Sequence, residues 1–307
     1  MKCFYSDDTP LDLPPGHRFP AEKYSRLRER LLEEGVVPAS ELLPSQPATD
    51  EQLLRVHTRD YLDRLVRGQL TDKEIRRIGF PWSPDLAERA RRSTGGTIMA
   101  GRSAMRNGVA ANLAGGTHHA HPDFGAGFCT FNDVAVAARE LQHSGLIDRI
   151  LVLDCDVHQG DGTARIFQDD SSVYTFSIHG RGNFPFNKAV SDLDVALPDG
   201  TGDDEYLIAL EGALEQCMQE ADADLVFYLA GADPYKEDSF GRMGLTKTGL
   251  AERDRLVLNV CRQVDLPVAI TMAGGYARNI EDIVEINLQT IRAAIEVYEK
   301  SDQGWGL

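Results

Sequence analysis

The residues most able to do chemistry in this 307-residue sequence follow an apolar stretch in the middle of the chain. Ile150–Leu153 is followed by Asp154, Asp156 and His158 at alternating positions, and then by a glycine-rich turn. Alternate residues of a strand share one face, so these three side chains are expected to point the same way at the end of a buried strand. Carboxylates in apolar surroundings repel one another and resist desolvation unless a cation lies between them. The pattern therefore predicts a metal site, and its carboxylate and imidazole groups suit Zn²⁺ or Fe²⁺.

A second apolar stretch, Leu225–Ala230, is also followed by an acid, Asp233. Asp233 precedes Pro234, and a residue before proline favours extended geometry, which would aim its side chain across the end of the sheet. An Asp-Pro pair alone is typical of many turns. Together with the first strand it predicts a third ligand, and two carboxylates with one imidazole leave a coordination position open, as catalytic sites require.

Two adjacent histidines, His118 and His119, follow the predicted strand Val109–Leu113. They could be metal ligands, acid–base groups or surface residues. Because three ligands are already assigned elsewhere, acid–base service fits them better, since imidazole titrates near neutral pH. Asp154 and Asp161 are available to fix their tautomers.

Two further residues have weaker patterns. Tyr276 follows a glycine pair at the end of the predicted strand Pro267–Met272, where its phenol could donate a hydrogen bond to a developing oxyanion. A tyrosine in that position is more often structural. His121, which precedes a proline, is expected to be a loop residue.

From about residue 107 onward, short apolar runs alternate with helical stretches, which predicts an α/β fold with an open, mainly parallel sheet sandwiched between helices. The expected strands are Val109–Leu113, Arg149–Cys155, Ser172–Ile178, Leu225–Ala230 and Pro267–Met272. The expected helices are Phe131–Ser144, Thr163–Phe167, Asp203–Glu220, Thr246–Val264 and Ile280–Glu299. The first hundred residues look mostly helical (Ala21–Glu34, Asp50–Arg67 and Pro84–Asn107) and are expected to cover one side of the sheet. The chemically active residues fall just after strand ends, where such sheets place their sites.

Composition narrows the class of protein. No linker or repeat interrupts the sequence, so residues 1–307 are expected to form one domain. The net charge is 32 − 48 = −16, which disfavours nucleic acid as a partner. An acidic surface could weakly attract Lys-rich peptides or polyamines, although acidity for solubility explains the charge equally well.

No membrane partner is expected, because no apolar run approaches the roughly 18 residues needed to span a bilayer. The N-terminal MKCFYSDDTP does not resemble a signal peptide. The five cysteines are widely spaced and predict neither a disulfide framework nor a thiolate site, so a cytoplasmic location is expected. Nothing in the sequence predicts an oligomeric state.

Four ordered segments resemble the signature segments of zinc-dependent histone deacetylases and their bacterial relatives. They are GGTHHAHPDFGAGFCTFNDVAVAA, LDCDVHQGDGTARIF, GADPYKEDSFGRMGLT and AGGYARN. STGGTIMAGR and GTGDDEYL look most like the class IV branch. The resemblance extends from about Arg18 to the last predicted helix, and it implies an arginase/deacetylase-like fold and hydrolysis of acylated amines.

The resemblance implies one zinc ion per chain, held by Asp156, His158 and Asp233. His119 would match the general base, with Asp161 behind it. His118, oriented by Asp154, would be its electrostatic partner, and Tyr276 would polarise the scissile carbonyl. The residues implied for the acyl-lysine tunnel are Gly127, Phe128, Phe184 and Phe240. A structural K⁺ ion would fall on Asp154 and Ser177, with main-chain oxygens of Asp156, His158 and Ile178.

Some features depart from the family pattern. Phe240 stands where relatives usually have Leu or Met, and Ala273 where they have Gly, which should be tolerated. Gly180–Asn183 is shorter than usual, and no acid aligns with the one that grips the substrate backbone in relatives, Phe80–Asp85 being the nearest segment. The expected substrates are Nε-acyl-lysine in a protein or peptide, with an acetyl or longer acyl group, or an acetylated polyamine. A non-catalytic module that binds acyl ligands is a more remote alternative.

A binuclear ureohydrolase on the same kind of sheet is the nearest enzyme rival. Such a site needs two more carboxylates, at positions that Gly160 and Gly231 occupy in this sequence. The pattern therefore favours a single-metal site.

Overall fold

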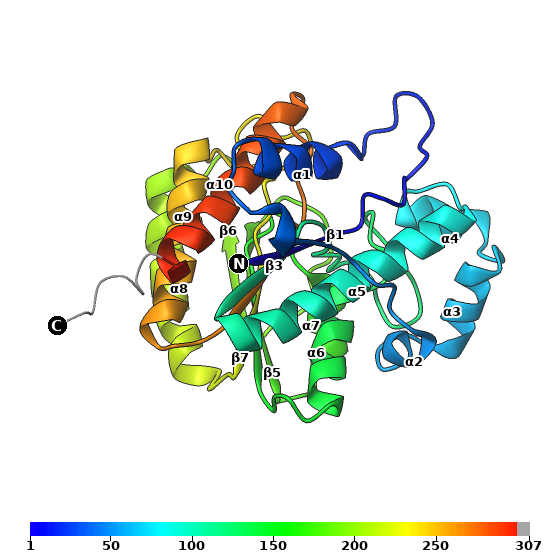
Figure 1. The fold of residues 1–307 in the computed structure, drawn as a ribbon, viewed down its shortest axis with the longest axis horizontal. Coiled ribbons are helices and arrows are strands. Elements are labelled where there is room, and N and C mark those ends of the chain that lie inside the picture. Colours follow the sequence, from blue (N-terminus) through cyan, green and yellow to red (C-terminus); the bar gives the residue numbers. More distant parts are fainter. Residues whose placement is uncertain (300–307) are drawn as a thin grey trace.

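The computed structural model describes residues 1–299. They form a single open α/β domain around an eight-stranded sheet in the order β2-β1-β3-β8-β7-β4-β5-β6 (Figure 1). All pairings between the strands are parallel. The strands are β1 (Lys2–Tyr5), β2 (Leu42–Pro44), β3 (Val109–Asn112), β4 (Ile150–Asp154), β5 (Val173–Gly180), β6 (Leu193–Leu197), β7 (Leu225–Leu229) and β8 (Val268–Thr271). The predicted fold class is confirmed.

The central strands are buried on both faces, as their continuous apolar runs require. Every residue of β3, β4, β7 and β8 is buried. In β4, Leu151 and Leu153 pack into the core on one side of the sheet, whereas Ile150 and Val152 pack into the core on the other. Helices must therefore cover both faces.

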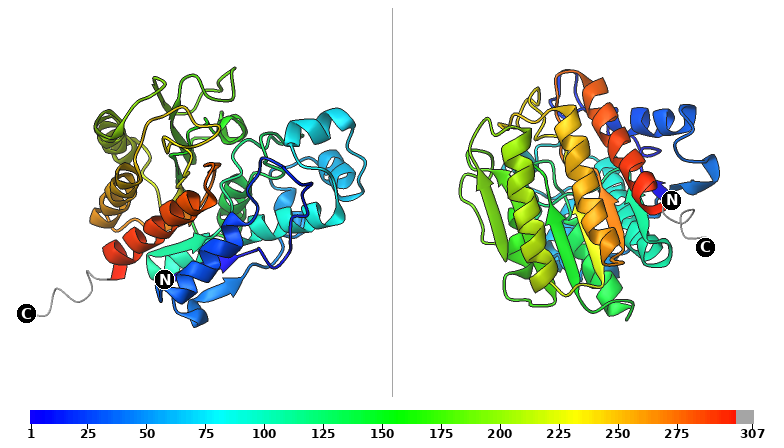
Figure 2. Two further views of the ribbon diagram at one scale, coloured as in Figure 1. Left: turned by 90° about the horizontal axis from the view of Figure 1, so that it is seen from above. Right: turned by 90° about the vertical axis from the view of Figure 1, so that its left-hand side faces the viewer.

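The helices form a layer on each face of the sheet. One layer holds α1 (Lys23–Glu33), α8 (Asp203–Glu220), α9 (Lys247–Gln263) and α10 (Ile280–Glu299). In the right-hand view of Figure 2, α8, α9 and α10 lie in front of the sheet. The other layer is built on α5 (Pro84–Asn107) and α6 (Asp133–His143), together with α2 (Asp50–Leu53), α3 (Arg59–Val66), α4 (Asp72–Ile78) and α7 (Asp161–Phe167).

The prediction for the first hundred residues was wrong in two respects. They do not cover one side only, since α1 packs with α10 on one face and α5 packs with α6 on the other. They also supply β1 and β2, two strands at one edge of the sheet. These strands are only three or four residues long, too short to leave a clear alternating pattern.

The predicted helix Asp50–Arg67 is two helices. α2 begins at a capping box formed by Thr49 and Gln52, and α3 begins where the Thr58 side chain accepts a hydrogen bond from the backbone of Tyr61. A cap at Thr58 starts a new helix because its extended backbone cannot continue the earlier one. Short α4 and β6 were also missed. The remaining predicted elements are present, with ends that coincide with the predicted ones or lie within two residues of them.

Four further predictions concern the extent of the domain, the cysteines, membrane spans and Ala273. Residues 300–307 of the predicted single domain lie outside the described residues. All five cysteines lie within the described residues, where they are buried and form no disulfide bond. Within residues 1–299, no helix is both long enough and apolar enough to cross a membrane. Ala273 is accommodated with a positive φ of 51°, a conformation that disfavours side chains other than glycine.

The packing of α1 against the sheet can be tested with two adjacent leucines. Leu31 is fully buried, whereas Leu32 is 41% exposed. Leu31→Ala should lower the free energy of unfolding by about 2–5 kcal/mol, because it leaves a cavity under the helix. Leu32→Ala, the matched control, should change it by less than about 0.5 kcal/mol. Urea unfolding of both variants measures this, and equal effects would contradict the placement of α1.

Candidate active site

Three predicted ligand side chains converge at the carboxyl ends of two neighbouring strands. One ligand atom from each of Asp156, His158 and Asp233 lies within 4.8 Å of the others. His158 Nδ1 is 2.9 Å from an oxygen of Asp156 and 3.2 Å from an oxygen of Asp233. The strands concerned, β4 and β7, are direct neighbours in the sheet. These three residues form a common donor set.

The backbone positions these side chains in a different way from the one predicted. β4 ends at Asp154, so Asp156 and His158 do not extend from a strand face. Backbone amides hold the acids in place instead. Asp156 accepts hydrogen bonds from the amides of His158 (2.9 Å) and Gly274 (2.7 Å), and Asp233 accepts one from Val157 (2.9 Å). A Cβ on Gly274 would lie 1.9 Å from Asp233 Oδ2, so only glycine allows this close approach.

The electrostatics of the donor set favour a cation. Asp233 is fully buried, and its Oδ2 atom has no hydrogen-bond partner. Burial, together with the charge of Asp156, raises the pKa of Asp233 to about 7. Burial disfavours the charged form of His158, but the two neighbouring carboxylates outweigh burial and raise its pKa to about 10. A proton on His158 offsets part of the negative charge of the two acids when no metal is bound. A divalent cation would supply positive charge at the same place, so the residues present fit one.

Two histidine–aspartate pairs lie beside the donor set. His118 Nδ1 is 2.6 Å from Asp154, and His119 Nδ1 is 2.6 Å from Asp161. Burial opposes protonation of His118, but Asp154 and Asp156 outweigh it and raise its pKa to about 9. Burial and the neighbouring His118 lower the pKa of His119 to about 4. The predicted carboxylate partner of each histidine is in contact with it.

His121 has a partner that sequence reasoning missed. It lies in a loop, as expected, but its Nε2 atom is 3.1 Å from the second oxygen of Asp161. Its ring also stacks on Phe124, with centroids 4.3 Å apart. The sequence signal for this contact was that His119 and His121 stand two residues apart. The proline after His121 favoured the interpretation as a loop residue instead.

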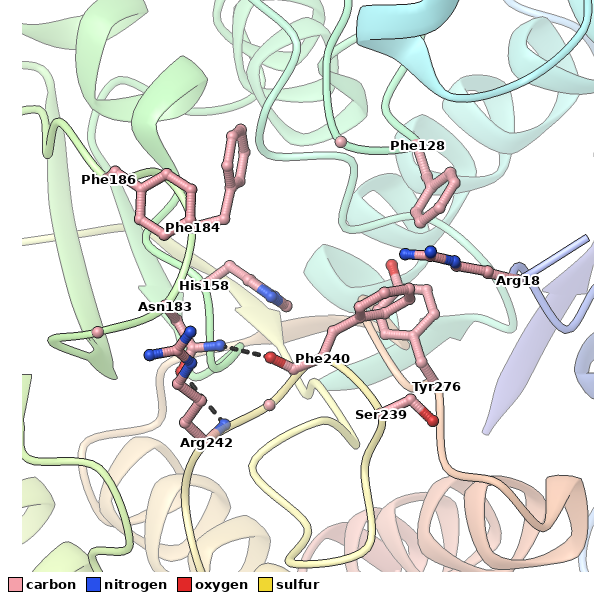
Figure 3. Close-up of a pocket in the computed structure, with 13 residues that line it drawn as sticks. Arg18, Phe128, His158, Asn183, Phe184, Phe186, Ser239, Phe240, Arg242 and Tyr276 are labelled. Carbon is pink, nitrogen blue, oxygen red and sulfur yellow. Dashed lines mark hydrogen bonds between the residues drawn. The ribbon is translucent and has the colours of Figure 1, made fainter.

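A cavity of about 460 Å³ opens above the donor set, with His158 and Tyr276 among the residues that line it (Figure 3). Its volume is in the range of small-molecule sites. Predicted wall residues Gly127, Phe128, Phe184 and Phe240 all line it as well. Phe184 packs edge-on against His119, with ring centroids 4.8 Å apart.

The opposite wall is held by strained backbone and aromatic packing. Phe128 has a φ of +64°, a left-handed conformation that costs on the order of 1–3 kcal/mol in a bulky residue. Its amide donates to Ile78 O at 2.7 Å, which fixes this conformation. Its ring centroid lies 5.7 Å from that of Tyr276 and 6.3 Å from that of Phe240. Strain concentrated here indicates a wall shaped for a ligand.

Tyr276 is positioned by residues that the sequence did not reveal. Its backbone amide donates to Asp238 at 2.6 Å. Lys23 is buried, and its ammonium group donates to the carbonyls of Ala273 (3.4 Å) and Gly275 (3.2 Å) while lying 5.2 Å from the Tyr276 ring centre. These contacts tie α1 to the glycine loop that carries the tyrosine.

The side chains expected around a monovalent cation are neighbours. Asp154 and Ser177 are paired residues of β4 and β5. Ser177 Oγ also lies 3.0 Å from His179 Nδ1. The nearest acid of the unaligned loop, Asp85, is exposed in the first turn of α5 and does not line the cavity.

Comparisons with known proteins identify the family. The histone deacetylase domain matches residues 17–291. The chain belongs to the histone deacetylase family. It is 47% identical over 294 residues to an uncharacterised protein of Picosynechococcus sp., covering 96% of this chain and 98% of that one. It is 30% identical to histone deacetylase 2 of Arabidopsis thaliana, covering 88% and 73% of the two chains. The crystal structure of a histone deacetylase homologue from Aquifex aeolicus superposes with a TM-score of 0.81 at 27% identity, covering 95% of this chain and 83% of that one.

In this deacetylase-family chain, a fully buried arginine links the two ligand loops. Arg253 of α9 donates to the carbonyl oxygens of Cys155 (3.3 Å) and Gly231 (2.5 Å), which lie one and two residues before a ligand. Its Nε atom donates to Asp254 at 2.9 Å. Asp254 in turn accepts hydrogen bonds from Tyr228 of β7 (2.5 Å) and from a threonine side chain of α10. Arg253 therefore sets the spacing between the strand ends of β4 and β7.

Replacing this arginine should destabilise the fold. Arg253→Met would remove the positive charge paired with buried Asp254 and the donor to two buried carbonyl oxygens, so we expect a loss of about 3–5 kcal/mol of unfolding free energy. Arg255→Met is the matched control on the same helix, because Arg255 is 39% exposed and its ion pairs, to Glu252 and Glu296, lie on the surface. Its effect should stay within about 0.5 kcal/mol. Chemical denaturation of both variants decides the matter, and a stable Arg253→Met protein would contradict the assigned role.

Proposed function

We propose that the protein hydrolyses the amide of Nε-acyl-lysine by activating a water molecule at a single metal ion. The observation that carries this proposal is the convergence of Asp156, His158 and Asp233, beside two His–Asp pairs, on the floor of an aromatic cavity. Membership of the histone deacetylase family supports the deacetylase chemistry.

The proposed ion is Zn²⁺, with Fe²⁺ as an alternative, bound once per chain by the donor set. Neutral imidazole with two carboxylates suits either metal and leaves room for a water and the substrate. When bound, the ion would polarise the acyl carbonyl and lower the pKa of water from 15.7 toward about 7.

We assign the remaining steps to residues around the donor set. His119, oriented by Asp161, takes a proton from the attacking water as general base. Tyr276 donates a hydrogen bond to the carbonyl oxygen as negative charge develops on it. His118, held by Asp154, supplies positive charge close to the same centre. A protonated imidazole then returns the proton to the leaving amine.

The aromatic side chains support a slender acyl-lysine substrate. Phe184 and Phe128 lie on opposite sides of the cavity (Figure 3), and Gly127 and Phe240 also line it. Flat rings on two sides suit an extended methylene chain that ends in an amide. The resemblance to the class IV branch favours lysine as the carrier, with acyl groups of acetyl length or longer. An acetylated polyamine is the alternative carrier.

We also propose a structural K⁺ ion beside the site. Its ligands would be the side chains of Asp154 and Ser177 and the main-chain oxygens of Asp156, His158 and Ile178. Support comes from the register that pairs Asp154 with Ser177 at the ends of β4 and β5.

A binuclear ureohydrolase-type site fits this geometry poorly. Bridging carboxylates would have to replace Gly160 and Gly231. A Cβ at Gly160 would lie 2.4 Å from Asp154 Oδ2, and one at Gly231 would lie 2.8 Å from the Asp156 backbone. Neither position has space for a larger residue, which supports one ion per chain.

Removal of the phenol tests the proposed chemistry. Tyr276→Phe should bind the metal normally but lose about 10²–10³-fold in kcat on an acetyl-lysine peptide, because an oxyanion donor acts in the transition state. Tyr174→Phe is the control, since Tyr174 bonds to Glu220 on the surface at the start of β5. Metal content and steady-state kinetics are measured on the zinc-loaded proteins. Near-normal turnover by Tyr276→Phe would refute the assignment.

A substrate panel tests the function itself. The zinc-loaded protein should release the amine from acyl-lysine peptides, and a hydroxamate should inhibit it. A pure binding module would bind the same peptides without turnover, and that outcome would overturn the proposal.

A further inference from the structure

The mouth of the cavity carries positive charge, although the whole chain carries a net charge of −16. Two arginines, Arg18 and Arg242, are among the residues that line the cavity. No aspartate or glutamate is among its lining residues in the described part of the chain. Cationic substrates would therefore meet like charge at the entrance, against the trend of the rest of the surface.

The two arginines differ in how far their charge is already balanced. Arg242 lies 3.3 Å from Asp199, and its backbone is tied to Asn183. Arg18 has no hydrogen bond or ion pair to any other residue in the range 1–299, and it is exposed. Its guanidinium lies 5.9 Å from the ring centre of Phe240. Arg18 is thus the cation at this mouth that remains available to a ligand.

The position of Arg18 places it beside the outer part of a bound substrate. Figure 3 shows its guanidinium pointing into the cavity between Phe128 and Phe240. Phe240 packs edge-on against Tyr276, with ring centroids 5.0 Å apart. Arg18 is exposed, whereas His158 of the donor set is buried, although both line the same cavity. The guanidinium therefore lies at the outer end of the cavity, on the side of the amine carrier.

We infer that Arg18 is a specificity residue that binds a carboxylate on the amine side of the substrate. This inference rests on the proposed function and deepens it. Guanidinium groups bind carboxylates through two parallel hydrogen bonds, and the cation–π contact with Phe240 keeps the group beside the cavity. The carboxylate comes from an acidic residue next to the acyl-lysine or from a free α-carboxylate. Acetylated polyamines, which carry extra positive charge, are disfavoured.

The size of the effect follows from the exposure of Arg18. An exposed ion pair of this kind changes kcat/KM by about five-fold. The preference should weaken as ionic strength rises, because salt screens charges that are open to solvent.

The experiment compares zinc-loaded wild type with Arg18→Gln, Arg18→Glu and Arg106→Gln. Arg106 is an exposed arginine in the last turn of α5, just before β3 begins and so at the opposite edge of the sheet from the site. Two pairs of substrates are used: acetyl-lysine peptides with Asp or Lys neighbours, and Nα-capped acetyl-lysine with a free α-carboxylate or a carboxamide. N-acetylputrescine is assayed beside them.

We expect wild type and Arg106→Gln to prefer the acidic member of at least one pair by about five-fold. The ratio should fall to near one in Arg18→Gln and invert in Arg18→Glu. The pair that responds identifies the source of the carboxylate. A general loss of structure would lower both members of a pair together, so the ratio reports on Arg18 specifically.

Two outcomes overturn the inference and are distinguishable. An unchanged acidic preference in Arg18→Gln, or a wild-type preference for Lys-flanked peptides or N-acetylputrescine, refutes the role of Arg18 while leaving deacylation intact. Absence of turnover on every substrate by the metal-loaded wild type refutes the proposed function, and this inference with it.

Discussion

Three carboxylates, those of Asp154, Asp156 and Asp233, are almost completely removed from water at the carboxyl ends of two adjacent strands. Burying even one such charge without a partner is costly, and acids this close together repel one another. Backbone amides, histidines and, in our account, a divalent cation stabilise this buried negative charge. The buried cations and the close approach of the glycine loop described above all lie around these acids.

The fold brings distant segments of the chain together at these buried acids. Parallel strands place all their carboxyl ends at one edge, so the loops after β3, β4, β7 and β8 meet there. Arg253 fixes the carbonyls before the ligands from one side, while Lys23 fixes the glycine loop from another. Both cations are buried and bind main-chain oxygens. They fix the distances between the loops. Because they bind carbonyl oxygens, they leave the oxygens of Asp156 and Asp233 available to a metal ion.

Much of this could be predicted from the sequence, because the relevant signals are local. The apolar run of β4 followed by alternating acids and a histidine is contiguous, and so is the run that ends in Asp233. The face argument used for Asp156 and His158 was nevertheless wrong, because β4 ends before them and tertiary hydrogen bonds, such as the one from Gly274, turn the chain. The residue types were informative even where the assumed geometry was not.

What the sequence could not predict depends on contacts between distant segments. β1 and β2 are recognisable as strands only once β3 is beside them. Lys23 lies on an ordinary-looking amphipathic helix, and nothing local indicates that it is buried under Tyr276. The charge at the cavity mouth likewise required the structure, because Arg18 and Arg242 are more than two hundred residues apart in a chain that is acidic overall.

The central claim is that one divalent ion completes the buried donor set. The most direct test is anomalous diffraction from crystals of the zinc-loaded protein, recorded on both sides of the zinc absorption edge. The account predicts one strong anomalous peak per chain, within bonding distance of Asp156, His158 and Asp233. Two peaks about 3.5–4 Å apart, as in two-metal sites, or none among these three side chains, would contradict it.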